Sequence, residues 1–375
     1  MIRRFYTGKI SDLLEPNKIL VVYGPRQVGK TTLIQDFLRS YSGKAYSSTG
    51  ENALLADILK SRDFTKIKSF FSGYDLIVID EAQKIDHIGS ALKIIVDQMP
   101  GIRVIATGSA SFDLSNKVGE PLVGRQRQIN LFPISVAEIV SHFGGAYPQE
   151  HLEHFMIFGS YPEVLTADSV GEKREILTLL RDGYLYRDIL ETENLRNSKK
   201  ILDLLRLIAF QIGKEVSLQE LGQRLGMSRA TVERYLDLLE KTFVLINLRG
   251  FSRNLRSEIS KTSRYYFYDI GIRNAVIDNF NPLNTRDDVG SLWENFIFME
   301  RLKKRSYQKI YANMYFWRTW QQQEIDLVEE RDGKIFGYEI KFSDKKIKTP
   351  TQWTKAYPQA AFETIHKSNY LDFII

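Results

Sequence analysis

The chain contains no cysteine among its 375 residues. Disulfide bonds, thiol nucleophiles and zinc sites built on cysteine are therefore excluded. It also lacks a long apolar run, because no stretch approaches the roughly 18–20 residues that a membrane-spanning helix needs. The first residues, Met-Ile-Arg-Arg-Phe-Tyr, do not contain the apolar core of a signal peptide. These absences predict a cytoplasmic protein with no membrane partner.

The composition that remains is that of a globular protein. Hydrophobic residues make up 43% of the chain and charged residues 26%, which is enough to bury sizeable cores. A length of 375 residues is too great for one ordinary domain and predicts two or three. The net charge of +6 permits an acidic partner such as nucleic acid but does not require one.

The clearest motif lies near the start, where the apolar run 19–23 leads into Gly-Pro-Arg-Gln-Val-Gly-Lys-Thr. This matches G-x-x-x-x-G-K-[ST], the phosphate-binding loop. The two glycines let backbone N–H groups turn toward phosphate oxygens at the start of the following helix. Lys30 is expected to reach the β- and γ-phosphates, and the Thr31 hydroxyl to hold Mg²⁺. We therefore predict ATP and magnesium as ligands, with ATP contacted by Gly24, Pro25, Arg26, Gln27, Val28, Gly29, Lys30, Thr31 and Thr32.

Two further strand-like runs end in polar residues. Residues 76–79 are consecutive branched apolar residues, typical of a strand buried in a parallel sheet, and Asp80 and Glu81 follow them. Open α/β sheets bind ligands at the carboxyl ends of their strands. Asp80 is therefore expected to hold magnesium through water, and Glu81 to polarise the attacking water. At the tip of the next run, either Thr107 or Ser109 could contact the γ-phosphate or that water.

These segments resemble the AAA-type ATPases, with 24–31 as Walker A, 76–81 as Walker B and 105–109 as the sensor-1 strand. The strings GPRQVGKTTL, IVIDEAQ, TGSAS, GEPLVGR and FPISVAE resemble a bacterial and archaeal ATPase family whose members carry an uncharacterised C-terminal domain. The resemblance implies ATP hydrolysis, a helical lid and a homo-oligomer such as a hexamer. It also implies that Arg125 enters a neighbouring subunit's site as an arginine finger, with a surface ion pair as the alternative.

The middle of the chain carries a helix-turn-helix pattern. Leucines at helical spacing precede Gly226, and Ser228 is placed to cap a second helix. Two strand-like runs, 243–248 and 264–268, follow with a basic segment between them. This order predicts a winged helix that either contacts DNA, with RNA not excluded, or only packs domains and binds protein. The candidate DNA contacts are Arg229, Thr231, Arg234, Arg253 and Arg256.

The C-terminal part predicts a helix at 292–304 followed by three strand-like runs. Alternation across the hairpin of the last two runs puts Asp326, Glu339 and Lys341 on a shared face. With Glu294 on the helix, this order resembles the PD-(D/E)xK nuclease fold. In that fold the acids bind one or two Mg²⁺, and the lysine positions or activates a water. The resemblance therefore implies a nuclease site, while solvated turns and edge charges are the alternative.

Together these patterns predict an α/β fold: a P-loop parallel sheet with a helical lid, then a winged helix and a small α/β PD-(D/E)xK-like domain. The expected bounds are 1–145 for the ATPase core, 146–198 for the lid or connector, 199–284 for the winged helix and 285–375 for the nuclease-like domain. The predicted function is Mg-dependent ATP hydrolysis coupled to nucleic-acid binding, remodelling or processing. The main alternative is a nucleotide-gated switch or scaffold for a protein partner, with a nuclease-like domain that does not cut. A small-molecule kinase would share the loop but leave the extensions without a purpose.

Overall fold

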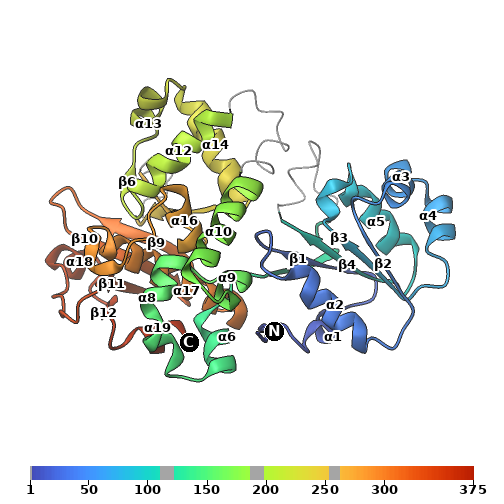
Figure 1. Cartoon of the computed structure of the whole chain (residues 1–375), viewed down its shortest axis with the longest axis horizontal. Coiled ribbons are helices and arrows are strands. Elements are labelled where there is room, and N and C mark those ends of the chain that lie inside the picture. Colours follow the sequence, from blue (N-terminus) through green and yellow to red (C-terminus); the bar gives the residue numbers. More distant parts are fainter. Residues whose placement is uncertain (1, 110–121, 186–197, 253–261) are drawn as a thin grey trace. The chain divides into compact units, whose positions relative to one another are not determined.

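The chain folds into two compact units, drawn in Figure 1. The computed structural model describes residues 2–109, 122–185, 198–252 and 262–375. The first unit contains residues 1–133 and a short segment, 241–243, and the second contains the remaining residues from 134 onward. Within the described ranges, no helix combines the length and the apolarity that crossing a bilayer demands.

The first unit is built on a five-stranded parallel sheet. In sheet order its strands are β2 (Ala45–Thr49), β3 (Leu76–Asp80), β4 (Arg103–Gly108), β1 (Ile19–Tyr23) and β5 (Gln126–Asn130). Its helices are α1 (Ile10–Leu13), α2 (Lys30–Ser40), α3 (Ala53–Ser61), α4 (Phe64–Phe70), the 3-10 turn η1 (Ala82–Lys84) and α5 (Ile88–Gln98).

The three central strands of this sheet are runs of buried apolar residues, as expected for a sheet covered on both faces. Buried side chains of α3, α4 and α5 form one core with residues of β1, β3 and β4, and Figure 1 shows α1 and α2 on the other side of the sheet. Because β4 lies between β3 and β1, the tip of β4 stands between the loop after β1 and the acids at the end of β3.

The second unit is built on a seven-stranded mixed sheet. In sheet order its strands are β12 (Ala361–Ile365), β11 (Lys334–Ile340), β10 (Glu324–Arg331), β9 (Asn313–Arg318), β7 (Leu245–Gly250), β8 (Ser263–Phe267) and β6 (Glu215–Val216). β7 runs parallel to β9, with Arg249 opposite Tyr315 and Gly250 opposite Phe316. This pairing joins the strands predicted for the wing to those predicted for the C-terminal domain. One compact unit therefore spans the boundary between 284 and 285, which stays a prediction.

The helices of the second unit surround this sheet. They are α6 (Val136–Phe143), α7 (Tyr147–Glu150), α8 (Leu152–Phe158), α9 (Pro162–Thr166), α10 (Val170–Leu180), the π-turn η3 (Arg181–Leu185), α12 (Ser198–Phe210), α13 (Leu218–Leu225), α14 (Arg229–Lys241), α16 (Ile270–Val276), the 3-10 turn η4 (Leu283–Thr285), α17 (Val289–Gln308), α18 (Thr351–Ala356) and α19 (Tyr370–Ile374).

Helix α6 belongs to the second unit, although the sequence places it in the ATPase core. Its first amide, the N–H of Val136, donates a hydrogen bond to the buried carboxylate of Glu300 on α17 at 2.7 Å. A buried charge-assisted bond of this kind fixes the start of α6 to α17. The two compact units divide near residue 133, and the boundary between 145 and 146 stays a prediction.

Helices α13 and α14 are joined by a tight turn. Gly226 ends α13 in the left-handed region, with φ of 59°, which a glycine adopts without strain. A Cβ on Gly222 would lie 2.6 Å from the carbonyl oxygen of Met227. Only glycine therefore lets α13 pack this closely against the backbone of the turn. Ser228 Oγ accepts a hydrogen bond from the N–H of Thr231 at 3.1 Å and caps α14.

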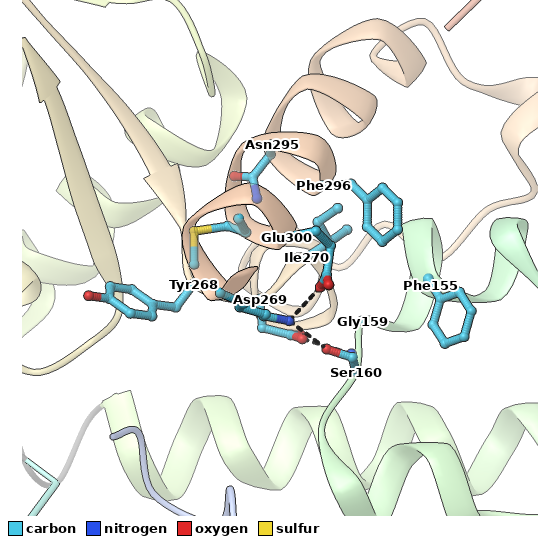
Figure 2. A pocket seen from close by; sticks show the side chains of 11 residues that line it. Phe155, Gly159, Ser160, Tyr268, Asp269, Ile270, Asn295, Phe296 and Glu300 are labelled. Atoms are coloured by element: carbon cyan, nitrogen blue, oxygen red, sulfur yellow. Dashed lines mark hydrogen bonds and ion pairs between the residues drawn. The ribbon is translucent and has the colours of Figure 1, made fainter. Parts of the chain in front are cut away.

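A small cavity of about 20 Å³ lies where the turn between α8 and α9 meets α16 and α17, and Figure 2 shows its lining. The Asp269 carboxylate accepts hydrogen bonds from the N–H of Ile272 at 3.2 Å and of Ser160 at 2.8 Å. Lys303 Nζ donates to Glu300 at 2.6 Å and to Ser160 Oγ at 3.3 Å. The cavity has room for about one water molecule. Because its polar groups bond one another, we assign it a structural role in holding these helices together.

Candidate functional site

The phosphate loop follows β1 and leads directly into α2. A Cβ on Gly24 would lie 2.0 Å from the carbonyl oxygen of Leu131, so only glycine lets the loop pass this close to the backbone after β5. Gly29 ends the loop with φ of 94°, in the left-handed region that favours glycine. Lys30 Nζ donates to the carbonyl oxygens of Gly24 and Pro25 at 2.9 and 2.8 Å. The ammonium is therefore folded over the loop that would receive the phosphates.

Asp80 is the point at which three elements meet. Its carboxylate accepts hydrogen bonds from the hydroxyls of Thr31 on α2, at 2.6 Å, and of Thr107 on β4. The Thr107 hydroxyl in turn accepts a bond from the N–H of Glu81 at 3.1 Å, and its side chain is fully buried. Because both sides of this hydroxyl are engaged, Thr107 positions the acidic pair. The predicted contact of Thr107 or Ser109 with the γ-phosphate or the attacking water stays a prediction.

Glu81 is held by residues around it. Its φ of 50° lies in the left-handed region, which is unusual for glutamate and common at functional sites. Gln83 Nε2 donates to the Glu81 carboxylate and, at 3.1 Å, to Ser109 Oγ. A Cβ on Gly50 would lie 2.4 Å from the carbonyl oxygen of Glu81. Gln83 thus holds the side chain of Glu81, and Gly50 leaves room for its backbone. The sequence analysis singled out neither residue, although Gln83 lies only two positions after Glu81.

Arg4 supports the phosphate loop from the start of the chain. Its guanidinium donates to the carbonyl oxygen of Val28 within the loop and to that of Phe132 at 2.6 Å. Only 7% of its surface is exposed, so it links the loop to the segment after β5 from inside the protein. Since its partners are distant along the chain, no local pattern in the sequence indicates this role.

The oxygens of Thr31 and Asp80 fit a magnesium ion. Mg²⁺ prefers oxygen ligands and usually takes one or two carboxylates together with water and substrate phosphates. A hydroxyl and a carboxylate lying 2.6 Å apart, beside the phosphate loop, supply such a pair. Thr31 and Asp80 would therefore hold the ion that accompanies a nucleotide.

Arg125 lies at the opposite end of the sheet from the phosphate loop. Its carbonyl oxygen accepts a hydrogen bond from the N–H of Ile19, the first residue of β1, at 2.9 Å, whereas the loop follows the last residue of β1. Its Nε donates to Asp97 at 2.6 Å, and this hydrogen bond raises the pKa of Arg125. Within one chain Arg125 forms a surface ion pair, so a role as arginine finger remains a prediction about a neighbouring subunit.

A second group of charged residues lies on the seven-stranded sheet. Lys341 Nζ bonds the carboxylates of Glu339 at 2.7 Å and of Asp326 at 3.3 Å. Glu294 on α17 accepts a hydrogen bond from the Tyr266 hydroxyl at 2.5 Å. Burial, followed by the nearby charge of Asp326, raises the pKa of both Glu294 and Glu339 well above the ordinary range. The structure thus gathers the acidic residues and the lysine of the predicted nuclease site.

Arg264, at the start of β8, stands among these acids and was missed from the sequence. Its Nη1 lies 3.5 Å from Glu294 and 3.7 Å from Asp326, and its Nη2 lies 2.9 Å from Glu324. Arg264 therefore places a second positive charge, beside that of Lys341, among these acids. In the part of the chain that the structure describes, no three acidic or histidine side chains are arranged to hold a metal ion. Nuclease activity of this group stays a prediction.

The candidate DNA contacts on α14 differ in how they are placed. Arg229 and Arg234 are exposed near the start of the helix. The Thr231 hydroxyl lies 2.9 Å from that of Ser228, so it takes part in the helix cap. The remaining two candidates fall outside the described residues, namely Arg253 and Arg256.

Three protein families match successive parts of the chain. Residues 16–140 match a family described as AAA domain. Residues 149–283 match the domain of unknown function DUF8612, and residues 289–368 match the domain of unknown function DUF4143. The first match and the geometry of the phosphate loop together support an AAA-type P-loop ATPase domain in the N-terminal part of the chain.

Similar proteins occur in bacteria and archaea. An uncharacterized protein from Mycobacterium tuberculosis is 29% identical over 347 residues, which cover 90% of this chain and 74% of the relative. An uncharacterized protein from Methanocaldococcus jannaschii is 27% identical over 316 residues, covering 78% and 68%. One from Haemophilus influenzae is 22% identical over 365 residues, covering 91% and 86%.

Three solved structures show a partial likeness to the chain. A Signal Transduction ATPase with Numerous Domains from Pyrococcus horikoshii aligns at 15% identity and a TM-score of 0.31, covering 80% of this chain and 45% of that one. The Thermotoga maritima RuvB Holliday junction branch migration motor aligns at 18% and 0.31, covering 61% and 81%. Domain III of the T. maritima replication initiation protein DnaA aligns at 16% and 0.28, covering 48% and 85%.

Proposed function

We propose that this protein is a magnesium-dependent AAA-type ATPase that couples ATP hydrolysis to the binding and remodelling of nucleic acid. One observation carries the ATPase part, the hydrogen bond from Thr31 to Asp80 at 2.6 Å. This bond joins the phosphate loop to the acidic tip of β3, the two parts that P-loop ATPases combine at one nucleotide. The match of residues 16–140 to the AAA domain supports the same conclusion.

Each part of the hydrolysis is assigned to a residue of this chain. The ammonium of Lys30 and the loop N–H groups bind the phosphates at the start of α2. Thr31, and Asp80 through water, would hold magnesium, which would supply neutralisation of the phosphate charge. Glu81 accepts the proton of the water that attacks the γ-phosphate, and Gln83 holds the Glu81 carboxylate.

The nucleic-acid part of the proposal rests on charge and on α14. The chain carries a net charge of +6, and Arg229 and Arg234 are exposed at the start of the second helix of the helix pair. In winged helices this helix enters the major groove while basic residues contact phosphates. A homo-oligomer belongs to the same proposal, with Arg125 leaving Asp97 to reach the nucleotide of the next subunit.

The experiment that tests the coupling is the rate of ATP hydrolysis with and without single- and double-stranded DNA and RNA. We expect nucleic acid to raise the rate several-fold, with the effect weakening as salt rises. Lys30→Ala serves as the control and should abolish turnover under every condition. A rate that no nucleic acid changes, together with no salt-dependent DNA affinity, would overturn the coupling and favour the switch or scaffold for a protein partner.

A further inference from the structure

A groove of about 850 Å³ lies on the second unit, outside the two sites described above. It is bounded by the end of β7, the turn between β9 and β10, and helix α18. Figure 1 shows β10 and α18 close together at one end of this unit. The groove is within the size range of ligand pockets, about 300–1,000 Å³. The residues that define its chemistry are Phe251, Trp317, Trp320, Gln321, Gln352 and Tyr357.

The floor of the groove is aromatic and rigid. The ring of Phe251 lies 5.3 Å from that of Tyr357, and the ring of Trp353 lies 4.8 Å from Tyr357 and 5.2 Å from Trp317. Trp353 and Trp317 are buried. Packed aromatic rings at these separations hold one another in place. Trp353 is fully buried and supports the lining from behind. The apolar surface of the floor therefore comes mainly from the half-buried Tyr357, with small contributions from Phe251 and Trp317.

The rim carries an exposed tryptophan. Trp320 lies in the turn between β9 and β10, and 91% of its surface is accessible to solvent. The chain has four tryptophans, and the other three, Trp293, Trp317 and Trp353, are buried. A large aromatic side chain exposed beside an aromatic groove is typical of a surface that binds a flat partner.

Side-chain amides line the wall next to this tryptophan. Gln352 Nε2 donates to Gln321 Oε1 at 2.8 Å, and the N–H of Gln352 donates to Gln323 Oε1 at 3.0 Å. These bonds orient the amides before any ligand arrives. The bond between the two side chains leaves Gln321 Nε2 as a donor and Gln352 Oε1 as an acceptor, and glutamine amides bond the edges of bases through such groups. Rings for base faces and amides for base edges therefore occur in one groove.

Positive charge accompanies the groove. Arg318 lines it with a side chain that is 40% exposed, and Glu215 bonds only Nη1 of its guanidinium, at 2.6 Å. Lysines and arginines beside stacked bases supply the phosphate contacts of single-strand binding proteins.

The acidic residues on the strands beside the groove are paired with arginines and therefore repel a polyanion only weakly. Glu324, opposite Arg318 across β9 and β10, bonds Arg264 at 2.9 Å. Arg264 also stands opposite Glu215 across β8 and β6. The acids nearest the groove are thus each paired with an arginine, and Arg318 is the basic residue of the groove lining.

We propose that this groove binds unpaired nucleotides of a single-stranded nucleic acid, with a base stacked on Trp320 and base edges bonded by Gln321 and Gln352. A duplex does not fit this chemistry because its base faces are covered by their neighbours. The inference rests on the proposed nucleic-acid function and deepens it by naming the substrate class and the surface. A proline-rich peptide, which also docks on aromatic grooves, is the competing occupant.

The test measures binding of a labelled poly(dT) oligonucleotide to the full chain by fluorescence anisotropy, and quenching of tryptophan emission in the same titration. Stacking contributes about 1–3 kcal/mol per base, so Trp320→Ala should weaken binding by ~5–150-fold. Trp320→Phe should retain most of the affinity and lose the quenching, because the remaining tryptophans are buried. Tyr311→Ala is the matched control, since Tyr311 is 84% exposed and does not line the groove.

The outcomes separate this inference from the proposed function. Affinity for poly(dT) that is equal in wild type and Trp320→Ala would overturn the groove while leaving nucleic-acid coupling intact. Wild type that binds no poly(dT) would also overturn the groove, whereas the proposed coupling falls only if duplex DNA and RNA too leave the rate of ATP hydrolysis unchanged. Binding of a labelled proline-rich peptide, lost in Trp320→Ala and not displaced by poly(dT), would assign the groove to a protein partner instead.

Discussion

At the scale of single residues, Thr107 shows how one hydroxyl can arrange two carboxylates. It donates to the side chain of Asp80 and accepts from the backbone of Glu81. The residue that would bind magnesium and the residue that would activate water therefore depend on the same atom. Removing that atom should disturb the chemistry without disturbing the phosphate loop.

Thr107→Val removes the hydroxyl and keeps the shape of the side chain. A hydrogen bond to a charged group contributes about 1.5–3 kcal/mol, which corresponds to ~10–100-fold in rate. We expect kcat for ATP hydrolysis to fall by this factor while the KM for ATP changes little. Thr107→Ser restores the hydroxyl and is expected to restore most of the rate. Wild-type kcat in the valine variant would contradict the positioning role.

Glu240, at the end of α14, gives a prediction about pH and stability. Burial and, to a lesser degree, Asp237 raise the pKa of Glu240 from 4.5 to about 7. An acid whose pKa is higher in the folded state binds protons more tightly there, so folding becomes less favourable as pH rises from about 4.5 to 7. At pH 8 the buried charge should cost about 1–3 kcal/mol.

Glu240→Gln removes this titration and should therefore stabilise the second unit at pH 8, with the gain disappearing below about pH 4.5. Urea unfolding of wild type and variant at several pH values measures the effect. Glu233→Gln, an exposed position on the same helix, is the control and should change little. A gain that does not vary with pH would show that Glu240 is not the titrating group.

At the scale of elements, a buried ion pair connects α17 to β10. Both Arg301 Nε and Nη2 donate to the Glu329 carboxylate, at 2.7 and 2.8 Å. Glu329 is fully buried and Arg301 is 4% exposed. Arg301 Nη1 also donates to the carbonyl oxygen of Phe373 in α19 at 2.8 Å. The Arg301 guanidinium on α17 thus bonds residues of both β10 and α19.

Glu329→Ala should destabilise the second unit by about 3–5 kcal/mol, because it leaves the Arg301 charge buried and uncompensated. Urea unfolding gives the change. Replacing both partners with apolar residues, as in Arg301→Met with Glu329→Leu, should recover most of the loss. The control is Glu220→Ala, which breaks an exposed pair with Arg224 and should cost less than about 1 kcal/mol. A cost for Glu329→Ala as small as that of Glu220→Ala would contradict the assignment.

The elements also show which features the sequence could predict. The phosphate loop, the acidic tip of β3 and the hairpin of β10 and β11 are each specified by neighbouring residues, so their patterns are legible along the chain. The parallel pairing of β7 with β9 joins Arg249 to Tyr315, which no local pattern encodes. The place of Arg264 among the acids follows from the same sheet and was missed for that reason. The only indication of this role in the sequence was that Arg264 is a charged residue directly before the buried aromatic residues of β8.

At the scale of the whole molecule, the two units carry different chemistry. The first holds the phosphate loop and the residues proposed for ATP hydrolysis. The second holds α14, the paired acids and the groove at Trp320, where a nucleic acid is proposed to bind. Because the two proposed activities lie in different units, a mutation in one unit should remove one activity and leave the other. Lys30→Ala and Trp320→Ala are the variants that should separate them.

The central claim is that the loop after β1 and the acids after β3 act on one ATP molecule. Single-turnover hydrolysis of bound Mg-ATP, with binding measured in the same samples, tests it most directly in wild type and Glu81→Gln. We expect both proteins to bind ATP and the variant to hydrolyse it ~100–10,000-fold more slowly, the usual contribution of a general base. Equal hydrolysis by the two proteins, or a wild type that binds no ATP, would contradict the account.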